Sequence, residues 1–283
     1  MAVIGCATGP AAPAARAPAA TQAPSAPAHG QEPEIPSDLA DAVAAAERVG
    51  QQLYVHDTAA ALASDATLSH FGKDPPRIGG WLASRATDEH GQPAPAFFVF
   101  FFSLETPWRV LVRVRVPLIT GARLEVEELR PPAVPDPHLE ALLRARQLAL
   151  ALPSVAKARR WNPVLLPGEL VGQHGWLVYL LQASPSREIV MGIHRRVLVS
   201  EDGRRVLFDQ PMSKSELRIP LEPEGQKIAG AWTTHALSDT PTEIHVLLSR
   251  QHDRPIFVAT RRGSWRVEAG RVHYLGPTAE PAP

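Results

Sequence analysis

The sequence contains one cysteine, four lysines and a single asparagine among its 283 residues. One cysteine excludes an internal disulfide bond. The 29 basic residues are balanced by 29 acidic residues, so the net charge is zero and no overall field attracts nucleic acid or an anionic membrane. Long apolar runs are also lacking. The densest, AFFVFFFSL at residues 96–104, is about half of the roughly 20 residues that a membrane-spanning helix needs.

The motifs of the common catalytic and nucleotide-binding sites are absent from the sequence. It has no G-x-S-x-G, H-E-x-x-H, H-x-H, G-x-G-x-x-G or P-loop. Ser154 and Lys157 have the S-x-x-K spacing of penicillin-binding enzymes, but Ser154 follows Pro153, and the companion S-D-N and K-T-G motifs are missing. The sequence therefore predicts no catalytic residue, no metal ligand and no cofactor. A hydrolase with an unrecognised active site is the alternative.

The later histidines are scattered singly, at His194, His235, His245, His252 and His273. Isolated histidines are more typical of solvated sheet faces than of a metal site. His245 lies between two apolar neighbours in a segment expected to be a strand, so we expect its side chain to face away from the apolar side. Arginine pairs occur in the same region. At zero net charge they do not predict a nucleic-acid partner.

Two helices are predicted from apolar spacing and capping residues. The first begins at Ser37, with Asp38 and Asp41 in its first turn, and buries one face, which consists of Leu39, Val43, Ala46, Val49 and Leu53. The second is capped by Asp136, has Pro137 at its first position and ends before Pro153; its buried stripe is Leu139, Leu142, Leu143 and Leu150. Residues 130–137 form the expected linker between two units.

Three hairpins can be registered from alternation and turn residues. A three-residue loop at residues 119–121 places Arg113 opposite Glu127, Arg115 opposite Glu125 and Val114 opposite Val126. The Asp202-Gly203 turn pairs Val199 with Val206, Val197 with Phe208 and Arg196 with Asp209. The Ala269-Gly270 turn pairs Val267 with Val272 and Trp265 with Tyr274. Glu125 and Glu127 are thus surface ion-pair partners rather than catalytic carboxylates.

The phenylalanines of residues 96–104 cover both faces of their strand, which is typical of a central strand buried on both sides. The predicted fold is α+β, with two units that each pack one helix on a curved antiparallel sheet. This architecture resembles the cystatin-like and NTF2-like style. The first unit spans residues 37–132 and the second 136–283. Strands over residues 243–275 are expected to extend the second sheet or to form a small appendage.

The amino-terminal segment carries the one family resemblance. Val3-Ile4-Gly5-Cys6 resembles a bacterial lipobox, in which a signal peptidase cuts before the cysteine and the thiol receives diacylglycerol. Residues 7–36 hold seven prolines and eleven alanines and almost no large apolar side chain, so they predict an unstructured tether. Residues 1–36 therefore form the lipobox-like start and its tether. The alternative is a chance match ahead of a disordered tail.

The resemblance implies a lipid anchor on Cys6 and a folded body held off the membrane, facing the periplasm. Ala7 after the cysteine favours the outer over the inner membrane. Lipoprotein signals need a basic start and an apolar stretch, which the five residues before Cys6 do not supply, so the resemblance implies either a start codon placed too late or a trimmed sequence. The expected function is a non-catalytic module that binds an envelope protein or a ligand. A structural subunit of an envelope assembly is a further alternative.

Overall fold

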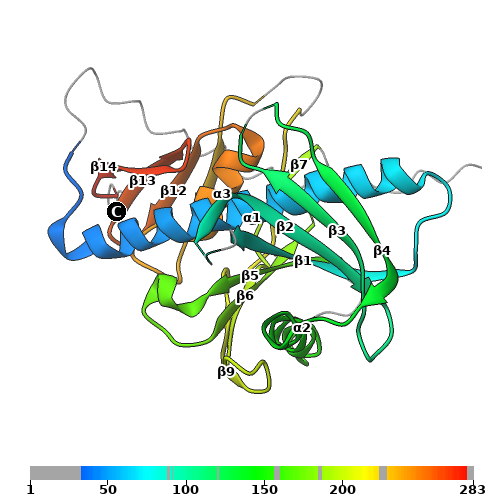
Figure 1. Cartoon of the computed structure of the whole chain (residues 1–283). Coiled ribbons are helices and arrows are strands. Elements are labelled where there is room, and N and C mark those ends of the chain that lie inside the picture. Colours follow the sequence, from blue (N-terminus) through cyan, green and yellow to red (C-terminus); the bar gives the residue numbers. More distant parts are fainter. Residues whose placement is uncertain are drawn as a thin grey trace, which may run out of the picture. The chain divides into compact units, whose positions relative to one another are not determined.

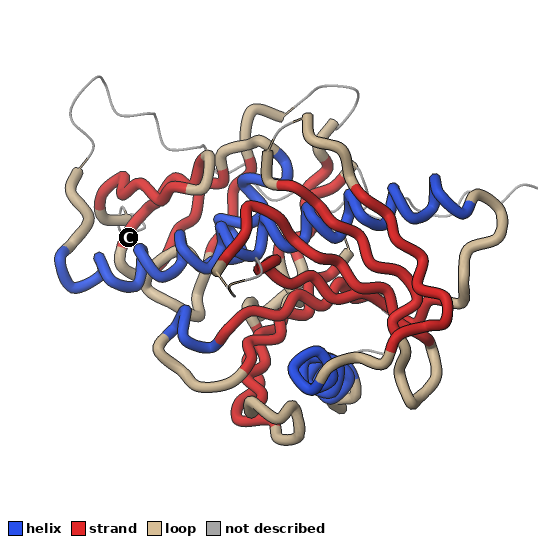
Figure 2. The backbone as a smooth tube through the Cα atoms, viewed as in Figure 1, coloured by secondary structure: helices blue, strands red, loops and turns tan. Residues whose placement is uncertain are grey.

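The structure is a computed structural model that describes residues 33–87, 90, 92–119, 121–155, 160–183, 187–222 and 228–278. The fold is α+β, as predicted: the described residues form 14 strands in four mostly antiparallel sheets and three α-helices. Figure 1 shows the order of these elements, and Figure 2 shows how strands dominate over helices. The lipobox-like residues, Cys6 and most of the expected tether lie outside the described residues.

The first helix, α1 (Ala40–Phe71), follows a 3-10 turn at Ser37–Leu39. Ser37 does not cap it with its side chain, but all five apolar residues predicted for its buried face are buried. The next four strands form an antiparallel meander, the first sheet, in the order β1 (Ile78–Thr87), β2 (Pro93–Ser103), β3 (Val110–Pro117) and β4 (Glu125–Ala133).

The register of β3 and β4 confirms the predicted hairpin. Arg113 lies opposite Glu127, Arg115 opposite Glu125 and Val114 opposite Val126. Both Arg–Glu pairs form exposed ion pairs, as alternation predicted.

The prediction that β2 is buried on both faces is only partly right. Phe97 and Phe101 are buried on the face toward α1. Phe98 and Phe100 on the other face are half-buried, and the Arg113 guanidinium lies over the Phe98 ring. A long cationic side chain therefore covers part of a surface for which the sequence predicted a second packed layer.

The second sheet is packed on both faces. It is preceded by α2 (Pro137–Leu150), which Asp136 caps by accepting a hydrogen bond from the Leu139 N–H, as predicted. Its strand order is β5 (Trp161–Pro167), β6 (Trp176–Gln182), β8 (Arg195–Val199) and β9 (Val206–Pro211). Side chains on one face of this sheet pack on α2, whereas those on the other face pack on α1 and on the third helix.

The remaining strands form two smaller sheets. β7 (Glu188–Met191) pairs with β10 (Leu217–Pro220). β11 (Ala231–Thr234) runs parallel to β12 (Ile256–Thr260), which continues antiparallel into β13 (Gly263–Glu268) and β14 (Arg271–Gly276). This last sheet confirms the pairings of Val267 with Val272 and of Trp265 with Tyr274. It is separate from the second sheet.

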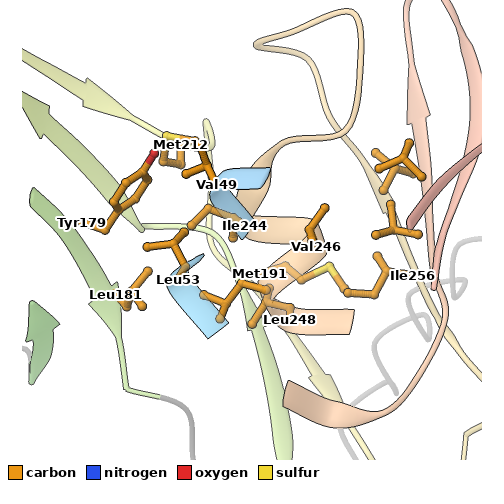
Figure 3. Close-up of a cluster of buried hydrophobic side chains, with 14 of the residues drawn as sticks. Val49, Leu53, Tyr179, Leu181, Met191, Met212, Ile244, Val246, Leu248 and Ile256 are labelled. Atoms are coloured by element: carbon orange, nitrogen blue, oxygen red, sulfur yellow. The ribbon is translucent and has the colours of Figure 1, made fainter. Parts of the chain in front are cut away.

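The two-unit arrangement predicted from the sequence is wrong because α1 is shared. Its first half contributes Val43, Val49 and Leu53, and the preceding 3-10 turn contributes Leu39, to a central core with β6 and with α3 (Glu243–His252). Its later residues Ala59 and Ala63 pack instead on the first sheet. Figure 1 shows α1 passing beside the strands of the first sheet and beside those of the carboxyl-terminal half. Figure 3 shows Val49 and Leu53 among side chains of the carboxyl-terminal half. A single helix thus joins the two halves, because it contributes to the core of each.

Residues 243–252 form α3 and not the predicted strand. Ile244, Leu247 and Leu248 are spaced three and four residues apart, which places them on one helical face, and all three are buried. Gly50 of α1 allows α3 to approach closely, since a Cβ on Gly50 would lie 2.5 Å from the Cβ of Val246. No helix of the described part is both long enough and apolar enough to cross a membrane.

Candidate ligand-binding cleft

A two-lobed cleft lies where α1, the second sheet and the start of α3 meet. Its first lobe has a volume of about 300 Å³ and its second about 360 Å³. Met212, His235 and Thr242 line both lobes, so the lobes adjoin. The wall that α1 gives to the first lobe consists of Ala42, Ala45, Ala46 and Val49. This lobe therefore combines an apolar side with the polar groups that form its floor.

The floor of the first lobe is a buried network centred on Glu243. Its carboxylate Oε1 accepts hydrogen bonds from the Tyr179 hydroxyl and from Arg196 Nη1, both at 2.8 Å. Arg196 also donates from Nη2 to Gln210 Oε1 at 2.6 Å. Glu243 is only 5% exposed and Tyr179 is fully buried. The network ties the first turn of α3 to β6, β8 and β9, which fixes the position of the lobe.

Burial and the ion pair set the protonation states of this network. Burial, followed by the nearby Glu243 carboxylate, raises the pKa of Tyr179 well above its usual value of 10. Burial is the largest single effect and disfavours the charged form of Arg196, but the charges and hydrogen bonds of Glu243 and Tyr179 together outweigh it, so the Arg196 pKa is raised. The floor therefore carries a neutral phenol and a compensated ion pair at physiological pH.

The structure corrects the register predicted for this region. Arg196 lies opposite Gln210 and not Asp209, because an irregularity between Leu198 and Val199 shifts the pairing by one residue. Val199 still pairs with Val206, but Val197 lies opposite Asp209 instead of Phe208. In this register Arg196 bonds Gln210 and Glu243, whereas Arg195 bonds Asp209.

Three of the scattered histidines come together at the second lobe, which corrects the prediction that they lie on solvated sheet faces. His194, His235 and His245 all line this lobe and all are buried. The rings of His235 and His245 meet edge to face, with centroids 5.0 Å apart. His252 and His273 are not among the residues that line either lobe.

Burial holds two of these histidines neutral, and backbone hydrogen bonds fix their positions. His194 accepts from the Gln182 N–H at Nδ1 and donates from Nε2 to the Val190 carbonyl, and burial lowers its pKa to about 4. His245 accepts from the Thr242 N–H at Nδ1 as part of a capping box. Burial, and then the neighbouring His235 and His194, lower the His245 pKa to about 3. These imidazoles serve structure and are too weakly basic for proton abstraction at neutral pH.

His235 differs from the other two histidines because its Nε2 atom is buried without a hydrogen-bond partner among the described residues. The side chain is 5% exposed and lies between the two lobes. Burial lowers its pKa, and the Glu243 carboxylate acts against that shift. A buried polar atom without a partner is costly, so this nitrogen is the cleft's clearest point for a ligand hydrogen bond.

The residues of the S-x-x-K match do not form a site among the described residues. The Ser154 hydroxyl donates to Asp209 Oδ2 at 2.6 Å, and Lys157 lies outside the described residues. The histidine cleft was missed because α3 was assigned as a strand. The spacing of Ile244, Leu247 and Leu248, after Thr242 as the helix cap, is the signal that would have placed His245 correctly.

Comparisons with protein-family models, with curated proteins and with solved structures found no match to this chain.

Proposed function

We propose that this chain is a non-catalytic lipoprotein of the bacterial envelope that binds a small amphipathic ligand in the two-lobed cleft. The single observation that carries the ligand-binding part is the first lobe. It places the apolar wall of α1 opposite Arg196, Gln210 and the unpartnered His235 nitrogen. Concave sites with mostly apolar walls and a few converging polar groups are typical of small-molecule binding.

Binding is favoured over hydrolysis by the state of the polar groups. A hydrolase needs an activated nucleophile and a base that titrates near the working pH. The Thr242 hydroxyl lies 3.1 Å from His245 Nδ1, but that nitrogen already accepts the Thr242 N–H and belongs to an imidazole with a pKa of about 3. This histidine is therefore a poor general base, whereas the His235 Nε2 atom, which has no hydrogen-bond partner among the described residues, suits hydrogen bonding to a ligand.

The envelope location is proposed on the resemblance of residues 3–6 to a lipobox. Lipidation of Cys6 would anchor the protein in the membrane, with the outer membrane favoured, and the following Ala- and Pro-rich residues would separate the body from the lipid surface. An envelope protein is the partner to which bound ligand would be passed.

The cleft is tested with 8-anilinonaphthalene-1-sulfonate, an amphipathic fluorescent probe. Ala45 is half-buried and lines the first lobe, so Ala45→Trp places an indole in the binding space. We expect saturable one-site binding to the wild type and a loss of at least about tenfold in affinity for Ala45→Trp.

The matched control is Ala44→Trp, one residue earlier on α1, where the side chain is exposed and outside the lining. It should bind the probe within about twofold of the wild type. Circular dichroism of both variants verifies that they are folded. Equal affinity of Ala45→Trp and the wild type would refute the cleft as the binding site.

A further inference from the structure

A second group of converging side chains lies away from the floor of the cleft. Glu169 belongs to the 3-10 turn η2 (Gly168–Val171), His174 to the loop before β6, and Glu201 to the turn between β8 and β9. One nitrogen or oxygen atom from each side chain lies within 4.8 Å of the other two, and all three residues are exposed. His174 Nδ1 is 3.9 Å from Glu201 Oε1.

We propose that Glu169, His174 and Glu201 bind a divalent transition-metal cation of the Zn²⁺ type. One imidazole and two carboxylates are ligands that Zn²⁺ accepts at about 2.0–2.2 Å. Two ligand atoms of a tetrahedral site at that distance are about 3.3 Å apart. The donor atoms already lie within 4.8 Å of one another, and exposed side chains have the rotamer freedom to approach that spacing.

The backbone already holds the three donors near one another. The Gly168 N–H donates to the Gly175 carbonyl at 2.7 Å, which closes the loop that carries His174. Trp176 Nε1 donates to the Glu201 carbonyl at 3.0 Å and ties the β8–β9 turn to the start of β6. Gly175 adopts a φ of +100°, and a Cβ there would meet the Val199 carbonyl oxygen. The loop therefore packs directly against the end of β8.

The charges of this group favour a bound cation. In the described part of the chain, neither Glu169 nor Glu201 forms an ion pair with an arginine or lysine. By contrast, Glu125 and Glu127 on the first sheet are each paired with an arginine. Arg144 and Arg205 line the same grooves, but among the described residues neither pairs with Glu169 or Glu201. The two carboxylates therefore converge without a direct cationic partner, and a metal ion would replace their repulsion with attraction.

Space is available for the remaining coordination positions. Glu201 lines two surface grooves, of about 520 Å³ and 360 Å³, that meet at the β8–β9 turn. Glu169 lines the first groove and His174 the second. A fourth position at the metal would therefore open to solvent, where water or a ligand group completes the coordination.

The test is calorimetric titration of Zn²⁺ into the full chain, without an affinity tag and in a buffer that does not chelate metal. We expect one ion per chain with a micromolar Kd. His174→Ala and Glu201→Gln should each weaken binding by at least about tenfold. Both changes are at exposed side chains, and circular dichroism verifies the fold.

The matched control is His138→Ala, which removes an exposed histidine of the first groove that lies outside the triad. Its affinity should stay within about twofold of the wild type. The proposal is overturned if the wild type takes up no Zn²⁺ at about 1 mM, if His174→Ala binds within about threefold of the wild type, or if His138→Ala loses as much affinity as His174→Ala. None of these outcomes depends on the amphipathic ligand.

Discussion

Replacing Glu243 with glutamine should destabilise the protein strongly, because the change leaves the Arg196 charge without its partner. The amide oxygen of the glutamine can still accept the hydrogen bond from Tyr179, so the measured loss of stability reports mainly the missing negative charge beside Arg196. Removing one member of a buried ion pair costs about 3–5 kcal/mol. The Arg196 side chain is 22% exposed, which lets water reach part of the guanidinium and places the expected loss near the lower end, at about 3 kcal/mol.

The assay is equilibrium unfolding in guanidinium chloride followed by circular dichroism, which gives the free energy of unfolding, and thermal unfolding should show a fall in Tm of about 6–12 °C. The double variant Arg196→Met/Glu243→Gln removes the unpaired charge and should recover at least half of the lost stability. Glu127→Gln is the control, because its ion pair with Arg113 is exposed and should cost under about 1 kcal/mol. A loss below about 0.5 kcal/mol for Glu243→Gln, or strictly additive losses in the double variant, would refute the reasoning.

Three further predictions concern the helices and the buried histidines. Gly50→Ala should destabilise by about 1–3 kcal/mol in thermal unfolding, because its Cβ would overlap Val246, whereas the same change in an exposed helix stabilises by about 1 kcal/mol. Asp136→Ala should cost about 1 kcal/mol in urea unfolding through loss of the α2 cap, and no change would contradict the capping role. Stability should also fall as the pH drops from about 6.5 toward 4, since unfolded histidines take up protons that His194 and His245 resist while folded. Each of the two histidines should lower the free energy of unfolding by up to about 3 kcal/mol across that pH range. Denaturant midpoints that do not change with pH would contradict this prediction.

Local structure was predictable wherever neighbouring residues determine it. The β3–β4 and β13–β14 registers follow from side-chain alternation and turn residues, which act over a few positions. The same argument failed by one residue at β8–β9, where a bulge places Arg196 opposite Gln210. A bulge inserts a residue without changing the turn, so alternation alone does not locate it.

Long-range contacts were not predictable from the pattern. Tyr179 and Arg196 reach Glu243 across 64 and 47 residues of sequence, and no local signal links them. The sharing of α1 between two cores depends on Gly50, whose missing side chain admits α3. Histidines that are isolated in the sequence were therefore expected at the surface, although the fold gathers three of them in one cleft.

The most direct test of the cleft is a nuclear magnetic resonance titration that observes the histidine side-chain nitrogens as 8-anilinonaphthalene-1-sulfonate is added. His235 should shift saturably, because its buried Nε2 lies between the two lobes and has no hydrogen-bond partner in the part of the chain that the structure describes. His56, buried against Phe97 near the first sheet and outside the lining of both lobes, should not shift. A saturable shift confined to the cleft histidines supports the account. An unchanged His235, or equal shifts at His235 and His56, would contradict it.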